Sequence, residues 1–248
     1  LEFDDFIEKA ERAIVEIADA ARGIAVVVGS PTVNPVAEGK DLFNSALFLH
    51  EGKVLHRAHK TLLPTYDIFD EYRYFEPGEN FDVVEYKGKK IALTVCEDIW
   101  NIANENPLYT VSPMDELNTK NPDFVINISA SPFTYTKARE RIEILRANVK
   151  AYNVPFIYVN HVGAQTEIIF DGGTLIMNER GVVVDELPYF EECLHSYTLD
   201  EISSSQNDKT QDADKYSLIF DALISGIRDY FTKLKFSTAV IGLSGGLD

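Results

Sequence analysis

Cys96 lies where a strand is expected to end and a helix to begin. The apolar, β-branched run at residues 90–95 predicts the strand, and Glu97 and Asp98 follow the cysteine directly. Backbone N–H groups at a helix N-terminus lower the pKa of a thiol and can bind an oxyanion. Cys96 is therefore a candidate nucleophile, although most single cysteines are small buried apolar residues, and position alone leaves that alternative open.

Two charged residues earlier in the chain could assist such a thiol. Lys60 ends a predicted strand at residues 53–60, where an ammonium group could hold a thiolate and stabilise negative charge on an attacked carbonyl. Glu71 follows eleven residues later, in a loop at residues 61–80, and could orient that lysine. Taken singly, each is more often a solvated surface charge.

The elements that must position these residues alternate between helix and strand. The opening segment LEFDDFIEKAERAIVEIAD has the apolar spacing of an amphipathic helix, and a second helix is predicted at residues 138–152. Strands are predicted at residues 24–29, 42–50, 53–60, 90–95, 124–128 and 156–160, with a hairpin over residues 173–186. Strands that alternate with helices and also pair as hairpins favour an α/β fold with a mixed sheet.

A change of composition marks a boundary near the C-terminus. Residues 203–215, SSSQNDKTQDADK, are polar and predict a linker. An amphipathic helix is predicted at residues 216–234, and an apolar strand at 236–243 that ends in a glycine-rich turn. We therefore expect one domain over residues 1–202, a linker over 203–215 and the start of a second domain over 216–248.

Composition and charge exclude several classes of function. The 248 residues carry 40 acidic and 23 basic side chains, a net charge of -17 that disfavours binding to nucleic acid. No apolar run is long enough for a membrane span, and no signal peptide is evident, so a cytoplasmic location is expected. Cys96 and Cys193 form no zinc or disulfide pattern, and no metal site is predicted in the first domain.

Four segments together resemble the nitrilase, or carbon–nitrogen hydrolase, superfamily. They are HKTLLPTYDIFDEYRYFEPG, ALTVCEDIW, NISASP and FDGGTLIMNERGVVV, in the order that the family shows. The resemblance implies a four-layer αββα sandwich, a homo-oligomer, and amide hydrolysis through a cysteine thioester. It also implies that Cys96 is the nucleophile, Lys60 the catalytic lysine and Glu71 the carboxylate that supports the lysine.

One part of the family's machinery is not found in this sequence. The resemblance implies a general-base glutamate located before the first helix, which would lie upstream of Leu1. Glu2, on the polar side of that helix, is a poor substitute. Because a thiol needs its proton removed, residues 1–248 alone are expected to be catalytically impaired, and the chain is expected to continue beyond both ends.

The segment IGLSGGLD at residues 241–248 resembles the pyrophosphate loop of ATP pyrophosphatases, whose final serine would be residue 249. It lacks the spacing and the lysine of a Walker A loop. The resemblance implies a Rossmann-like α/β synthetase domain that begins here and binds ATP, with Mg²⁺ bound only with the nucleotide. The implied ATP-binding residues are Gly242, Leu243, Ser244, Gly245, Gly246, Leu247 and Asp248.

A nitrilase-type amidase followed by such a loop resembles the family of glutamine-dependent NAD⁺ synthetases. The resemblance implies glutamine, ATP and deamido-NAD⁺ as substrates, with glutamine bound by Tyr66, Ser131 and Lys137. Without it, the three would be interpreted as a core aromatic, a turn residue and a solvated charge. Lys137 stands where some relatives carry arginine, which binds carboxylates differently.

Two other functions stay open at this point. The chain could be a free-standing amidase or carbamoylase of the same superfamily, or a non-catalytic interaction protein with this fold. Trp100, Tyr109 and Phe133 are predicted to pack in the core or to line the cleft, and no role is assigned to Cys193.

Overall fold

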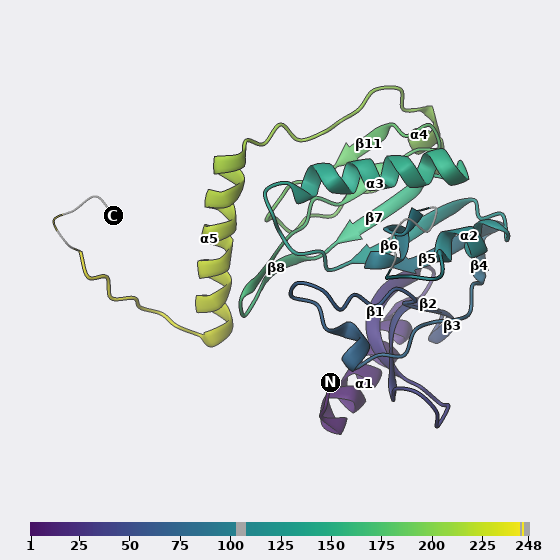
Figure 1. The fold of residues 1–248 in the computed structure, drawn as a ribbon, viewed down its shortest axis with the longest axis horizontal. Coiled ribbons are helices and arrows are strands. Elements are labelled where there is room, and N and C mark those ends of the chain that lie inside the picture. The colour runs from purple at the N-terminus through teal and green to yellow at the C-terminus, as the bar shows by residue number, and fades with distance from the viewer. Residues whose placement is uncertain (103–107, 244, 246–248) are drawn as a thin grey trace.

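The computed structural model describes residues 1–102, 108–243 and 245 (Figure 1). The first sheet is antiparallel and contains β1 (Ala25–Val33), β2 (Leu42–His50) and β3 (Lys53–His59) in that order. The second sheet has the order β11, β10, β7, β6, β5 and β4, with bounds Val183–Glu186, Leu175–Met177, Phe156–Asn160, Phe124–Ser129, Lys89–Val95 and Val83–Tyr86. A separate hairpin joins β8 (Val162–Gln165) to β9 (Ile168–Asp171).

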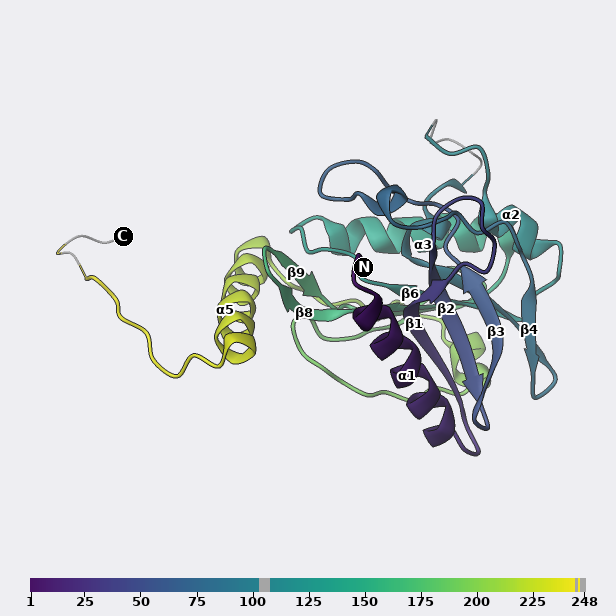
Figure 2. The ribbon, with the colours of Figure 1, turned by 90° about the horizontal axis from the view of Figure 1, so that it is seen from below.

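Helices α1 (Asp4–Ala20) and α3 (Lys137–Tyr152) lie on the outer faces of the first and the second sheet. The other helices are α2 (Pro113–Asn118), α4 (Leu199–Ser204) and α5 (Lys215–Leu234), and α5 packs against the β8–β9 hairpin. Two short 3₁₀ turns are η1 (Glu71–Arg73) and η2 (Cys96–Ile99). Figure 2 shows α1 on the side of the first sheet and α3 on the far side of the second. The order of layers is therefore helix, sheet, sheet, helix, which confirms the αββα sandwich that the sequence predicts.

Strand β2 shows how alternating side chains build this sandwich. Successive side chains of a strand point to opposite faces, so β2 can contribute to two cores. Leu47 and Leu49 pack against Ile14 and Ala18 of α1. Phe48, on the other face, packs among residues of the second sheet such as Ile91 and Leu93. The nearly continuous burial of β2 follows from this central position.

The second sheet has a core of three parallel strands. β5 pairs with β6, and β6 with β7, in registers that place Val95 beside Ile128, and Ser129 beside Asn160. Parallel strands bring their carboxyl ends to one edge of a sheet, where ligands commonly bind in α/β folds. Cys96 follows β5 at that edge, so the topology brings it close to the ends of β6 and β7.

The helices and strands predicted up to residue 202 are observed, with shifts of a few residues at their ends. The short elements β4, β8, β9, α2 and α4 were not predicted. The helix predicted at residues 216–234 is α5. Asp214 caps its N-terminus, where the side chain accepts hydrogen bonds from the N–H groups of Tyr216 and Ser217.

The strand predicted at residues 236–243 is wrong for this structure. Residues 236–243 are irregular and exposed. A strand needs a neighbouring strand to accept and donate its backbone hydrogen bonds, and the apolar pattern alone does not provide one. Figure 1 shows this segment leading away from α5.

The predicted linker, residues 203–215, lies along the edge strand β11. The Lys209 N–H donates to the Val183 carbonyl at 2.9 Å, and the Gln211 side chain donates to the Glu186 carbonyl at 2.8 Å. Ser203 and Ser204, the first two residues of the predicted linker, form the end of α4. These polar contacts fit the polar composition of the segment, in which Ala213 is the one apolar residue. The division into domains stays a prediction. Among the described helices, none is both long and apolar enough to cross a membrane.

Candidate active site

Cys96 occupies a strained turn at the end of β5. It begins the 3₁₀ turn η2 with a φ of 46°, a left-handed conformation that costs energy for a residue other than glycine. The amide of Asn127 donates to the Cys96 carbonyl at 3.4 Å, and Asp98 Oδ2 accepts from the Val95 N–H at 3.0 Å. The predicted elbow is confirmed, with a short 3₁₀ turn in place of a regular helix.

A cavity of about 340 Å³ opens over this turn. It is bounded by the ends of β5, β6 and β7 and by residues from the first sheet. Its lining consists of Gly29, Asn44, Lys60, Glu71, Val95, Cys96, Ile128, Ser129, Ala130 and His161. The three residues predicted to be catalytic therefore meet at one cavity.

Lys60 and Glu71 form an ion pair beside the nucleophile. Lys60 follows β3, and its Nζ lies 2.5 Å from Glu71 Oε1. The Asn44 amide donates to the other carboxylate oxygen at 3.3 Å. Glu71 is placed by η1, where its N–H donates to the Pro64 carbonyl at 3.1 Å. The Lys60 side chain is only 1% exposed, so the surface-lysine alternative is wrong.

The charges in the cavity depend on one another. Burial lowers the pKa of Lys60, but the nearby Cys96 and the Glu71 carboxylate more than offset it, and the net shift is upward. Burial raises the pKa of the Cys96 thiol, and Lys60 opposes that shift. Lys60 therefore stays charged, and the thiol needs a base before it can attack.

Asp98 connects the two segments that carry the nucleophile and the lysine. Its Oδ1 accepts from the N–H groups of Thr61 at 3.0 Å and Leu62 at 2.9 Å, while Oδ2 binds Val95 as described above. Burial raises its pKa to about 6 against the opposing effect of these hydrogen bonds. Its position two residues after Cys96 gave no indication of this role.

Tyr66 lies beside the nucleophile turn through Glu97. Its hydroxyl donates to Glu97 Oε1 at 2.6 Å, and the Tyr109 hydroxyl donates to the same oxygen at 3.0 Å. Burial and this carboxylate raise the pKa of both phenols. Tyr109, expected only to pack or to line the cleft, is thus a polar partner of Glu97, a buried carboxylate that sequence reasoning missed.

Ser131 is buried next to the cavity rather than in its lining. Its N–H donates to Asn160 Oδ1 at 2.9 Å, and its carbonyl and hydroxyl accept from Arg141 Nη2 at 3.0 and 3.3 Å. Arg141 in turn makes a bidentate ion pair with Asp171, and both side chains are 1% exposed. This network fixes the loop that follows β6, which supplies Ser129 and Ala130 to the cavity.

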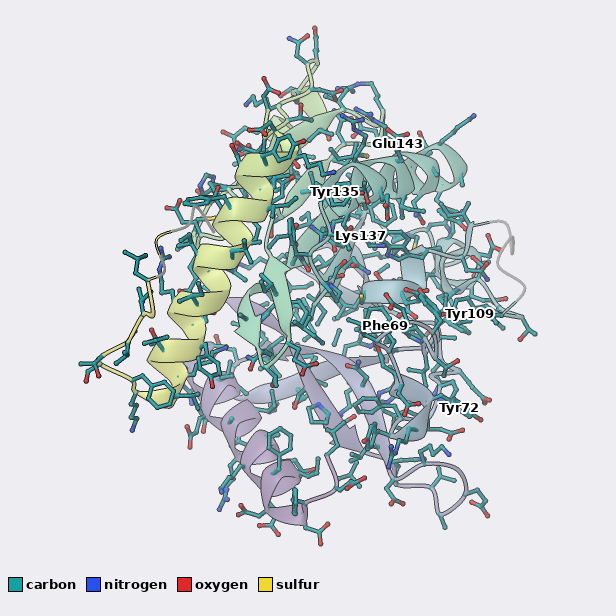
Figure 3. The ribbon with its side chains drawn as sticks, turned by 60° about the vertical axis from the view of Figure 1, so that its left-hand side comes forward. Phe69, Tyr72, Tyr109, Tyr135, Lys137 and Glu143 are labelled. Atoms are coloured by element: carbon teal, nitrogen blue, oxygen red, sulfur yellow. The ribbon has the colours of Figure 1, made fainter. Side chains whose placement is uncertain are left out.

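Lys137 begins α3 and lies over the indole of Trp100. Its Nζ is 4.1 Å from the ring centroid and 3.1 Å from Glu140 Oε2. In the view of Figure 3, Lys137 lies between Tyr135 on one side and Phe69 and Tyr109 on the other. Since Trp100 directly follows η2, Lys137 is close to the nucleophile turn but outside the cavity lining.

The residues predicted to bind ATP are not part of this site. Gly242, Leu243 and Gly245 are described and lie in exposed chain, where a Cβ added to either glycine would meet nothing within 4 Å. They form no cradle for a phosphate here. Ser244, Gly246, Leu247 and Asp248 lie outside the described residues.

Other charged residues do not complete the site. Glu71 is the one carboxylate among the described residues that line the cavity, and it is bound to Lys60. Glu2 lies 3.8 Å from Arg73 on the surface. Cys193 is exposed, and the described residues contain no group of acidic, histidine or cysteine side chains suited to a metal ion. A larger groove, of about 1110 Å³, runs between α3 and residues 208–218, and no cysteine or histidine is among the described residues that line it.

Comparisons with known proteins agree with the fold. Residues 3–205 match the carbon–nitrogen hydrolase family, and the chain belongs to that family. An amidase from Nesterenkonia sp. AN1 shares the fold, with a TM-score of 0.60 over 73% of this chain and 64% of the amidase at 24% identity.

Relatives that share one name match more of the chain than residues 3–205. The chain is 38% identical to the glutamine-dependent NAD(+) synthetase of Synechocystis sp. and 35% identical to that of Acinetobacter baylyi, over 98% of this chain and 45% and 42% of those proteins. The structure of glutamine-dependent NAD⁺ synthetase from Acinetobacter baumannii in complex with ADP matches with a TM-score of 0.78 and 28% identity, over 93% of this chain and 42% of that one. The chain thus spans less than half the length of these relatives.

Proposed function

We propose that this chain hydrolyses the side-chain amide of glutamine through a thioester on Cys96. The observation that carries the proposal is the buried Lys60–Glu71 ion pair, which lines the same cavity as Cys96. A lysine that keeps its charge beside a strained, half-buried cysteine is suited to stabilising an oxyanion, and has no evident value for packing.

The chemistry follows from these groups. The Cys96 thiol gives its proton to a base, and the sulfur attacks the carboxamide carbon. Lys60 and the Glu97 N–H, in the first turn of η2, stabilise the oxyanion. The C–N bond then breaks, the nitrogen takes a proton and leaves as ammonia, and a thioester remains. Water attacks the thioester, which releases glutamate and restores the thiol.

Charges around the cavity suit the two ends of an amino acid. Glu97 provides a buried carboxylate next to Cys96 that could accept an ammonium group, with Tyr66 and Tyr109 holding its Oε1 atom. Lys137, over Trp100, provides a cation for a carboxylate. Ser131 is held close by through Arg141. We propose that Tyr66, Ser131 and Lys137 contribute to glutamine binding in this arrangement.

For the whole protein we propose that the ammonia serves ATP-dependent amidation of deamido-NAD⁺. The support is that relatives named glutamine-dependent NAD(+) synthetase match over 98% of the chain, including α5 and the residues after it. These relatives favour this function over a free-standing amidase or a non-catalytic protein. ATP with Mg²⁺, a homo-oligomer and a cytoplasmic location belong to the same proposal.

The proposal is tested by ammonia release from glutamine. In the full-length protein we expect release that depends on Cys96, is abolished by Cys96→Ala and increases when ATP and deamido-NAD⁺ are present. The same preparations incubated with asparagine serve as the substrate control. Equal ammonia release by the wild-type and Cys96→Ala proteins would refute the assignment of the nucleophile.

A further inference from the structure

Asp98 is a buried carboxylate that the proposed chemistry does not use. Its side chain is only 4% exposed and does not line the cavity. Its two oxygens accept hydrogen bonds from the N–H groups of Thr61, Leu62 and Val95, all within 3.0 Å. Hydrogen bonds to an ionised acceptor are about twice as strong as neutral ones, so this carboxylate binds three backbone N–H groups strongly.

These three groups belong to the two segments on which the reaction depends. Thr61 and Leu62 follow Lys60, and Val95 precedes Cys96. One oxygen binds the first segment and the other binds the second, so Asp98 bridges the lysine and the nucleophile without touching either functional atom. The Lys60–Glu71 ion pair, in contrast, joins two side chains and does not bind the backbone on either side of Cys96.

The backbone conformation at Cys96 requires hydrogen bonds that stabilise it. A φ of 46° at a residue with a side chain persists only where surrounding contacts determine it. Asp98 binds the residue before the cysteine, and Asn127 binds the cysteine carbonyl. Loss of either bond would let the turn relax and move the sulfur relative to the ammonium group.

We infer that Asp98 is a positioning residue that fixes the separation of the Lys60 ammonium group from the Cys96 sulfur. It rests on the proposed function only in taking glutamine as the substrate. A carboxylate is required because both of its oxygens accept, whereas an asparagine would direct an NH₂ group at an N–H group on one side. Burial raises its pKa to about 6, against the opposing effect of the three N–H groups and of Lys60, so it is ionised at neutral pH.

The test is a double-mutant cycle on the full-length protein. The wild type, Asp98→Asn, Lys60→Ala and the double variant are treated with iodoacetamide, and the rate of alkylation at Cys96 is followed by mass spectrometry across pH. We expect Asp98→Asn to slow alkylation about 10- to 100-fold at neutral pH, because a displaced lysine stabilises the thiolate less. The midpoint of the pH profile should move upward. In the Lys60→Ala background the same substitution should change the rate less than twofold.

A matched control is available at the opposite end of β5. Asp123 accepts hydrogen bonds from the Lys90 N–H and the Lys89 ammonium group at the other end of β5. Asp123→Asn should leave the alkylation rate and its pH midpoint unchanged. If Asp98→Asn yields little folded protein, Asp98→Ser, whose hydroxyl can reach only one of the two segments, enters the same cycle.

Two results would overturn the inference. One is an Asp98→Asn rate within twofold of the wild type. The other is an equal slowing in the wild-type and Lys60→Ala backgrounds, which would show that Asp98 acts independently of the lysine. With glutamine, kcat should fall while KM stays within about threefold. Absence of ammonia release by the wild type would refute the proposed function, while the alkylation cycle would still decide the role of Asp98.

Discussion

Burial usually removes the charge from a lysine, yet at Lys60 the net effect of the surroundings is to retain it. The Glu71 carboxylate, 2.5 Å from Nζ, and the nearby Cys96 more than offset the cost of burial. The charge that would stabilise an oxyanion is therefore maintained by a carboxylate that never needs to touch the substrate. This separates the role of Glu71 from that of a general base.

We expect Glu71→Gln to slow glutamine hydrolysis about tenfold or more at neutral pH. Since Glu71 raises the pKa of Lys60, its removal lowers that pKa, and the lysine loses its proton at a lower pH. The alkaline limb of the pH–rate profile should consequently move to lower pH. Glu76→Gln is the matched control, because Glu76 accepts from the Lys40 N–H away from the cavity. An unmoved alkaline limb would contradict this account.

At the scale of elements, a buried ion pair joins α3 to the edge of the sheet that carries the site. Arg141 of α3 binds Asp171 at the end of β9 and also holds Ser131, in the loop after β6. Asn160, at the end of β7, donates to the same Asp171 carboxylate at 3.3 Å. Four elements thus meet at one pair of charges beside the cavity.

Arg141→Met should lower the free energy of unfolding by about 3–5 kcal/mol, because it leaves the Asp171 carboxylate buried without its partner. Urea unfolding measures the change. Arg139→Met, on an exposed face of the same helix, should change stability by no more than about 0.5 kcal/mol. A loss below about 1 kcal/mol for Arg141→Met would show that the network relaxes around the missing charge.

Helix α5 is attached to the β8–β9 hairpin by specific contacts. The Ala164 N–H donates to Asp229 Oδ2 at 2.6 Å, Lys233 donates to the Ala164 carbonyl, and Ile169 packs against Gly226. The hairpin leads directly to His161 in the cavity lining, whose N–H donates to the Ser129 carbonyl at 2.9 Å. Figure 1 shows α5 alongside β8.

Asp229→Ala should loosen this attachment. Loss of a charge-assisted hydrogen bond of about 1.5–3 kcal/mol should speed amide hydrogen exchange in β8, β9 and the last turns of α5 by roughly ten- to a hundredfold. Asp221→Ala, on an exposed position of the same helix, should leave exchange unchanged. Exchange rates in the hairpin that match those of the wild type would show that α5 is held by its apolar contacts alone.

At the scale of the whole molecule, two side chains among the described residues that line the cavity can accept a proton, Glu71 and His161. Glu71 is paired with Lys60, and burial lowers the pKa of His161, which makes its neutral imidazole a weaker base. General-base catalysis contributes about 10²- to 10⁴-fold. A base supplied by a part of the protein outside residues 1–248 therefore stays a prediction.

We expect residues 1–248 produced alone to be alkylated at Cys96 by iodoacetamide but to release ammonia from glutamine at least about 100-fold more slowly than the full-length protein. Circular dichroism of both proteins checks that the fragment is folded, and Cys96→Ala in each provides the background rate. Equal turnover by the two proteins would show that the base lies within residues 1–248.

Much of the fold could be predicted because its patterns are local. The spacing of apolar residues indicated α1, α3 and α5, and β-branched runs bounded by turns indicated the long strands. Short elements such as β8 and β9 contain too few residues for a period to show. The apolar pattern at residues 236–243 predicted a strand wrongly, because a strand depends on a partner that no local pattern specifies.

The sequence by itself determined which chemistry is available: a cysteine at the end of a strand, a lysine and a carboxylate, in an order that the carbon–nitrogen hydrolase family shares. Only the tertiary structure decided that Glu71 lies on Lys60, that Tyr109 binds Glu97, and that Asp98 bridges the two catalytic segments. The physical reason is that residue types and periodicity are encoded within a few positions. Contacts between residues more than ten positions apart are set by sheet register and by the need of buried polar groups for partners.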